Sequence, residues 1–141
     1  MRRLILAAMV LASVPALAEP TIVEGPTPAV SDSGVLTQNF GIETLGGVFT
    51  YLIDRGCRVP CSISKTFPTA VDNQTEVKLL LYRGNAKLSK DATALGVYTV
   101  IGIPALPRAE PQVAVTFSVL RDKITVAAVD KKTNLPLVIA K

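Results

Sequence analysis

The sequence contains no histidine and no tryptophan, and only 5% of its 141 residues are aromatic. Without histidine, the Ser-His-Asp and Cys-His arrangements of nucleophilic enzymes are excluded. Two cysteines alone also supply too few ligands for a zinc site. No Gly-x-x-x-x-Gly-Lys-Ser/Thr loop is present, so a nucleotide phosphate has no recognisable cradle. The sequence therefore predicts a protein that is not an enzyme and that needs no metal or other cofactor.

Charge of either sign is sparse and scattered. The chain has 15 basic and 11 acidic residues, and no basic run is longer than Lys131-Lys132. Nucleic-acid binding normally needs a clustered basic footprint, so we expect no nucleic-acid partner. The carboxylates of Glu43, Asp72 and Glu76 carry no mark of an acid–base pair and are predicted to be solvated or bonded in turns.

The first eighteen residues have the organisation of a signal peptide. Arg2 and Arg3 precede an apolar run over residues 4–14, and Ala-Leu-Ala at residues 16–18 is a small-x-small cleavage sequence. An uncleaved anchor is the alternative, but the apolar stretch is shorter than the ~20 residues that a comfortable span needs. We expect cleavage after Ala18, export to the periplasm or medium, no membrane span in the mature protein, and a mature net charge of about +2.

Cys57 and Cys61 are the two cysteines, and three residues separate them. An oxidising compartment favours a disulfide, which would close a very small loop between two strands. Two separate thiols are the alternative. A redox centre is not indicated, because the spacing is not Cys-x-x-Cys.

The remaining sequence divides into a flexible N-terminal arm, residues 19–37, and an all-β domain, residues 38–141. The arm is rich in proline, glycine and serine and has little apolar pattern. Beyond it, apolar residues alternate with polar ones in short segments that turn signals separate, which predicts a two-sheet antiparallel β-sandwich. The expected strands are 40–45, 47–53, 61–67, 75–83, 94–101, 112–119, 122–129 and 135–140. Residues 89–91, Ser-Lys-Asp, are an alternative helical turn.

Three segments carry a family resemblance. Residues 41–48 read Gly-Ile-Glu-Thr-Leu-Gly-Gly-Val, and residues 66–75 read Thr-Phe-Pro-Thr-Ala-Val-Asp-Asn-Gln-Thr. The third segment, residues 102–117, begins Gly-Ile-Pro-Ala-Leu-Pro-Arg and continues to Pro-Gln-Val-Ala-Val-Thr-Phe. In this order and spacing they resemble the peptide-binding β-domain of the heat-shock 70 (DnaK-like) chaperones, over about 100 residues. The hydrophobic linker to the family's ATPase domain and the helical lid after its β-domain have no counterpart in this sequence.

The resemblance implies a groove for an extended peptide. Such a groove holds the peptide backbone by main-chain hydrogen bonds and takes one apolar side chain in a pocket. The family's arch residues, which close over the peptide, correspond to Leu45 and Ala70. The residue of its central pocket corresponds to Val77, and the residues of its pocket walls correspond to Ile42, Phe67 and Leu79. The positions near the peptide backbone correspond to Thr44, Thr69 and Gln74. By pattern alone, the apolar strand residues Ile42, Phe67, Val77 and Leu79 would be ordinary core, whereas Leu45 at a strand end would not.

Two functions remain open at this stage. The first is an exported, stand-alone chaperone-like module that binds extended apolar segments of unfolded proteins without ATP. The alternative is a structural or adaptor module of the cell envelope with one dedicated partner, for which residues 135–139 could supply an edge strand or tail.

Overall fold

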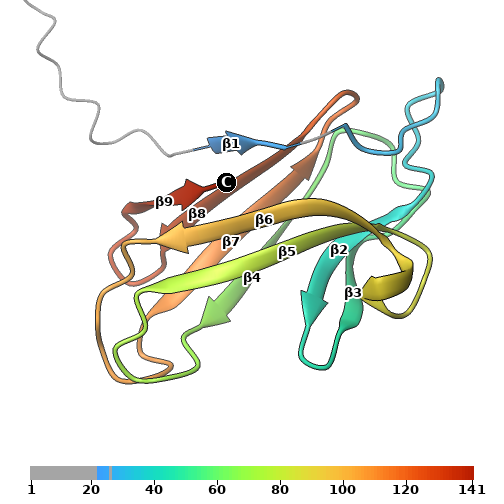
Figure 1. Ribbon diagram of the computed structural model, residues 1–141. Coiled ribbons are helices and arrows are strands. Elements are labelled where there is room, and N and C mark those ends of the chain that lie inside the picture. Colours follow the sequence, from blue (N-terminus) through green and yellow to red (C-terminus); the bar gives the residue numbers. More distant parts are fainter. Residues whose placement is uncertain (1–21, 26) are drawn as a thin grey trace, which may run out of the picture.

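Nine antiparallel strands make up most of residues 22–25 and 27–141, the part of the chain that the computed structural model describes (Figure 1). They confirm the predicted all-β sandwich. The predicted signal peptide, residues 1–18, lies outside the described residues. No helix in the described part is both long and apolar enough to cross a membrane. The strands are β1 (Ile22–Glu24), β2 (Asn39–Thr44), β3 (Val48–Ile53), β4 (Cys61–Pro68), β5 (Glu76–Gly84), β6 (Thr93–Ile101), β7 (Gln112–Val119), β8 (Ile124–Asp130) and β9 (Pro136–Ala140).

The strands form two layers that β9 joins. Strand order runs β3-β2-β5-β6-β9-β8-β7-β4, and β1 pairs with β8. β9 pairs with β6 through Val138–Ala140 and with β8 through Pro136 and Leu137. Every residue of β9 therefore pairs with one neighbouring strand inside the domain, so residues 136–139 are not the unpaired tail that the adaptor alternative considered.

The core lies between the layers and follows the alternation of the sequence. The paired strands β7 and β8 point every second residue inward, and β5 and β6 meet them from the other layer. The rings of Phe40 and Phe117 meet edge to face, with centroids 5.8 Å apart. Burying each such side chain stabilises the fold by roughly 1.5–3 kcal/mol. The completely buried residues with the largest side chains include Phe40, Leu81, Tyr98, Val100, Val115, Phe117 and Ile124.

A short strand within residues 19–37 was not predicted. β9 covers only Ala128 and Val129 on its side of β8, and β1 pairs with the stretch of β8 from Thr125 to Ala127. Glu24 fixes β1 further, because its carboxylate lies 2.7 Å from the Lys123 ammonium. This ion pair lowers the pKa of Glu24. The segment thus adds a strand to the sandwich.

The structure joins Cys57 and Cys61 by a disulfide in the connection between β3 and β4. The backbone N–H of Leu36 donates to the carbonyl of Cys57 over 2.9 Å, so the bridged loop also holds the incoming N-terminal segment. Between β5 and β6, residues Ser89–Asp91 form a 3-10 helix, η3, which agrees with the helical turn considered for this stretch.

Candidate functional site

The site begins with a bend in β2 at Gly41. The register of β2 against β3 shifts between Phe40 and Gly41, as in a β-bulge. A Cβ at position 41 would stand 2.0 Å from the Thr50 carbonyl oxygen, so a side chain there would have to displace backbone. Glycine therefore allows β2 to bend. β2 pairs with β5 only as far as Ile42 opposite Leu81, and beyond that point the two strands diverge (Figure 1).

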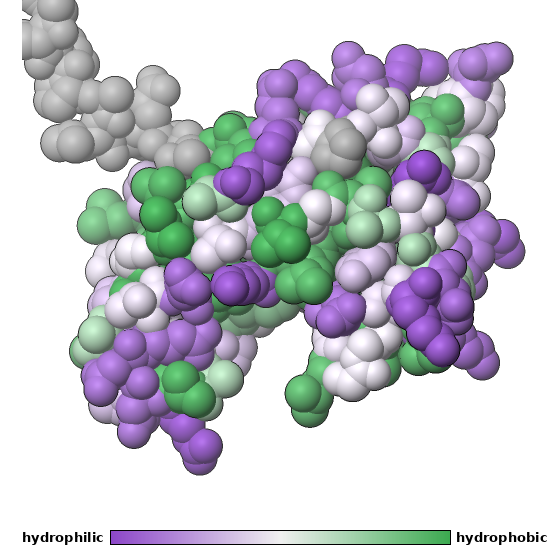
Figure 2. Space-filling model, in the orientation of Figure 1, coloured by the Kyte–Doolittle hydropathy of each residue, from purple (hydrophilic) through white to green (hydrophobic). Residues whose placement is uncertain are grey.

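This divergence leaves one edge of β5 open. From Glu76 to Leu80, β5 pairs with β6 on one side and has no strand partner among the described residues on the other. Figure 2 shows the surface deeply notched between the β2–β3 turn and the β4–β5 connection. Unpaired backbone N–H and C=O groups at such an edge can pair with an added extended segment.

The β2–β3 turn forms one wall of this notch. Gly46 and Gly47 have φ values of 85° and 74°, which side chains resist, and Gly47 donates its N–H to the Thr44 carbonyl over 3.1 Å. The turn holds Leu45 with 99% of its surface exposed. A leucine this exposed has no part in the core and is available to a ligand.

The β4–β5 connection forms the other wall and is braced from two directions. Gln74 accepts hydrogen bonds from the backbone N–H of Ala70 (2.7 Å) and of Val71 (3.3 Å), and donates one to the Glu76 carbonyl. The buried Thr69 hydroxyl accepts from the backbone N–H of Ala109 over 2.9 Å. The second and third resembling segments therefore meet here, although Thr69 and Ala109 are 40 residues apart in the sequence.

A graded apolar face lies between the walls. Ile42, Val77, Leu79 and Leu81 share the inner face of β2 and β5. Their burial is complete at Leu81 and nearly so at Leu79 and Ile42, whereas Val77 is half-buried. The inner face of the sandwich thus becomes accessible toward the start of β5, where β2 has turned away.

The nine predicted site residues fall into three groups in the structure. Exposed side chains on the walls belong to Thr44, Leu45 and Ala70, and half-buried apolar ones to Phe67 and Val77. Ile42 and Leu79 are core residues behind them. Thr69 and Gln74 direct their polar atoms into the protein, so their role is to position the wall.

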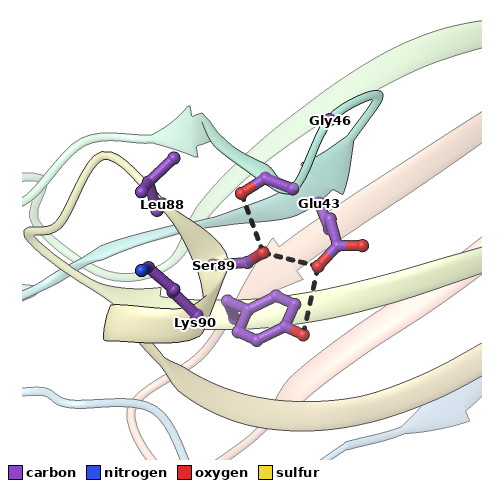
Figure 3. Close-up of a pocket in the computed structure, with 7 residues that line it drawn as sticks. Glu43, Gly46, Leu88, Ser89 and Lys90 are labelled. Atoms are coloured by element: carbon purple, nitrogen blue, oxygen red, sulfur yellow. Dashed lines mark hydrogen bonds between the residues drawn. The ribbon is translucent and has the colours of Figure 1, made fainter.

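Sequence reasoning missed Gly41 as the cause of the bend, and it missed a second hollow on the opposite face of β2. This pocket of about 420 Å³ lies between the β2–β3 turn and η3 (Figure 3). Glu43 points into it because β-strand side chains alternate, so Ile42 and Thr44 face the other way. The alternation of side chains along the strand was the sequence signal that could have predicted the direction of Glu43. The lining residues are Glu43, Gly46, Gly47, Tyr82, Leu88, Ser89 and Lys90.

Comparison with known proteins gives a consistent result. The sequence model of a family described as Hsp70 protein matches residues 22–139. A mitochondrial heat shock 70 kDa protein of Pisum sativum is 45% identical over 97 residues, which are 68% of this chain and 14% of that protein. The mitochondrial heat shock 70 kDa protein of Dictyostelium discoideum is 38% identical over 114 residues, 80% of this chain and 17% of that protein. The chain spans only about a sixth of the length of these relatives, yet the family match covers most of it. The chain therefore belongs to the Hsp70 family.

Proposed function

We propose that this chain binds extended apolar segments of polypeptides in the notch between the β2–β3 turn and the β4–β5 connection. One observation carries the proposal. The β2–β5 ladder stops at Ile42 and Leu81, which leaves the edge of β5 unpaired beside a half-buried apolar face. A bound segment would supply the missing hydrogen-bond partners and place one apolar side chain against Val77. Leu45 and Ala70 stand at the two walls and would close over it.

The binding would not require ATP. Every residue that the proposal uses lies in the β-sandwich. Its hydrogen bonds and apolar contacts with a peptide would form when the two are mixed, with no energy supplied by ATP. Without a nucleotide cycle, affinity and exchange follow from the groove alone, as in a passive holdase. The chaperone-like role of this chain thus rests on reversible capture of apolar segments.

We further propose that the protein works outside the cytoplasm. The basic, apolar and small-residue order of residues 2–18 supports export. The disulfide between Cys57 and Cys61 supports an oxidising compartment, since cytosolic thiols are kept reduced. Mass spectrometry of the protein from culture medium or periplasm tests this, and a chain that retains residues 1–18 in the cytoplasm contradicts it.

A pair of substitutions on β5 tests the groove. Val77→Phe enlarges a half-buried side chain on the inner face, where the bound apolar side chain would sit. Leu80→Phe enlarges a half-buried side chain on the outer face of the same strand. Fluorescence anisotropy of a labelled leucine-rich peptide should show saturable, ATP-independent binding to the wild type and to Leu80→Phe, and at least tenfold weaker binding to Val77→Phe.

Thermal unfolding of both variants is the folding control, because overpacking can cost about 1–3 kcal/mol on either face. A charged peptide of the same length is the ligand control. Equal binding by a folded Val77→Phe protein, or no preference for the apolar peptide, contradicts the groove. That result would favour the adaptor alternative, in which one folded partner uses another surface.

A further inference from the structure

The pocket behind the β2–β3 turn contains a carboxylate that forms no ion pair with the described residues. Glu43 is half-buried, and one of its oxygens accepts hydrogen bonds from the hydroxyls of Ser89 and Tyr82. Figure 3 shows its other oxygen turned away from both hydroxyls. Within residues 22–25 and 27–141, the one ion pair joins Glu24 to Lys123, so Glu43 has no such partner. Partial burial without a cation makes this oxygen a strong acceptor for a charged donor.

The rest of the pocket suits a ligand with a short apolar stem. Leu88 and the ring of Tyr82 supply apolar surface on the η3 side and from β5. On the turn side, a Cβ at Gly46 would meet nothing within 4 Å. The wall of the pocket there consists of backbone with no side chain above it. Lys90 extends from the opposite side of Ser89 and away from Glu43 in Figure 3. A cationic head would therefore lie at the Glu43 end, away from the Lys90 ammonium.

We propose that this pocket binds a primary ammonium or guanidinium group on a short apolar stem. The cation would donate hydrogen bonds to the free oxygen of Glu43, and the stem would lie against Leu88 and Tyr82. A small free amine and a lysine or arginine side chain of a polypeptide offer the same chemistry. The volume of about 420 Å³ accommodates either one.

The pocket also shares its wall with the proposed peptide groove. Ser89 donates its backbone N–H to the Gly47 carbonyl over 3.0 Å, so η3 is tied to the turn that carries Leu45. An occupant between Glu43, η3 and the glycines would brace that turn. This step rests on the proposed function: a braced turn should release groove peptide more slowly, and coupling between two sites must be reciprocal.

Amide NMR titration with n-butylguanidinium and n-butylammonium tests the site without any peptide. We expect saturable shifts at Gly46, Gly47 and Ser89 in the millimolar range. Glu43→Gln keeps the shape of the side chain and removes its charge, and should weaken binding at least tenfold. Glu76→Gln, an exposed carboxylate on β5, is the matched control and should leave binding unchanged. No saturation, equal binding by Glu43→Gln, or equal shifts with n-butanol would overturn the proposal.

Two further experiments identify the source of the cation and test whether the pocket is coupled to the peptide groove. N-acetylarginine amide adds a peptide backbone to the cation, so tighter binding than n-butylguanidinium indicates a polypeptide side chain, and equal or weaker binding indicates a free amine. Saturating n-butylguanidinium should slow groove-peptide release by about fivefold, the low end of usual couplings, in the wild type and not in Glu43→Gln. Unchanged release would overturn the bracing role alone, and failure of the groove itself would leave the peptide-free titration intact.

Discussion

At the scale of single residues, the exposed leucine on the β2–β3 turn is the most direct link between sequence and proposed function. Leu45 is 99% exposed, so truncation cannot open a cavity in the core. Leu45→Ala should change the free energy of unfolding by less than about 0.5 kcal/mol. It should weaken peptide binding by about fivefold, since part of a leucine's burial, about 1 kcal/mol, is lost from the complex. Anisotropy and urea unfolding measure the two effects, and unchanged affinity would remove Leu45 from the groove.

Tyr98 gives a second prediction at this scale. Its hydroxyl is buried and has no hydrogen-bond partner among the described residues. An unsatisfied buried donor costs roughly 1–3 kcal/mol, so Tyr98→Phe should raise the free energy of unfolding by about 1 kcal/mol. Tyr51→Phe is the control, because the Tyr51 hydroxyl donates to the Ala86 carbonyl over 2.8 Å. That variant should lose up to about 1 kcal/mol. Urea unfolding of both variants decides, and a destabilised Tyr98→Phe contradicts the assignment.

The same residue predicts a pH dependence. Burial raises the pKa of Tyr98 above its ordinary value of 10.0. The folded protein then holds this proton more tightly than the unfolded chain does, so the free energy of unfolding contributed here is constant below pH 10.0 and falls as the pH rises above it. Tyr98→Phe should show a shallower alkaline loss of stability than the wild type, and identical slopes would contradict the buried hydroxyl.

The sequence predicted some residue roles and not others for a physical reason. Leu45 beside two glycines at a strand end indicated a side chain outside the core, and it is outside. Thr69 and Gln74 were predicted to lie near bound peptide, but their hydrogen bonds serve the β4–β5 connection and the loop that carries Ala109. A polar residue's partner depends on which backbone groups the fold brings near it, which a linear pattern does not contain.

At the scale of elements, alternation placed eight strands within two residues of their observed bounds. It missed β1, because three residues are too few for a period of two to emerge, and because β1 forms only where β9 leaves the edge of β8 open. The bend at Gly41 was equally hidden, since it depends on the approach of the Thr50 carbonyl from the neighbouring strand.

The disulfide gives a prediction about the β3–β4 connection. A bridge between residues four apart closes a loop of about five residues, which in the chain-entropy model stabilises the folded state by about 2 kcal/mol. The double variant Cys57→Ser, Cys61→Ser should therefore unfold at a lower urea concentration but still fold. Reduction of the wild type should give the same shift, and the reductant should not affect the double variant. No shift in either protein would contradict a formed disulfide.

At the scale of the whole molecule, the predicted sandwich and the Hsp70 family membership agree with the structure. The shape of the proposed groove could be described only from the folded structure. Its walls come from residues 45–47 and 69–75, and its open edge from residues 76–80. The family resemblance placed these segments at one site, whereas the pattern of apolar residues alone could not separate Val77, at the opening, from Leu79, in the core. Their difference arises only where β2 turns away from β5.

Amide hydrogen exchange with and without a saturating leucine-rich peptide tests the central claim most directly. If the peptide pairs with the open edge of β5, exchange should slow in residues 76–80 and at the two walls, residues 44–47 and 69–74. The outer edge of β4 should be unaffected, and Val77→Phe should abolish the protection. Protection confined to another edge, or none at a peptide concentration that saturates binding, would contradict the groove.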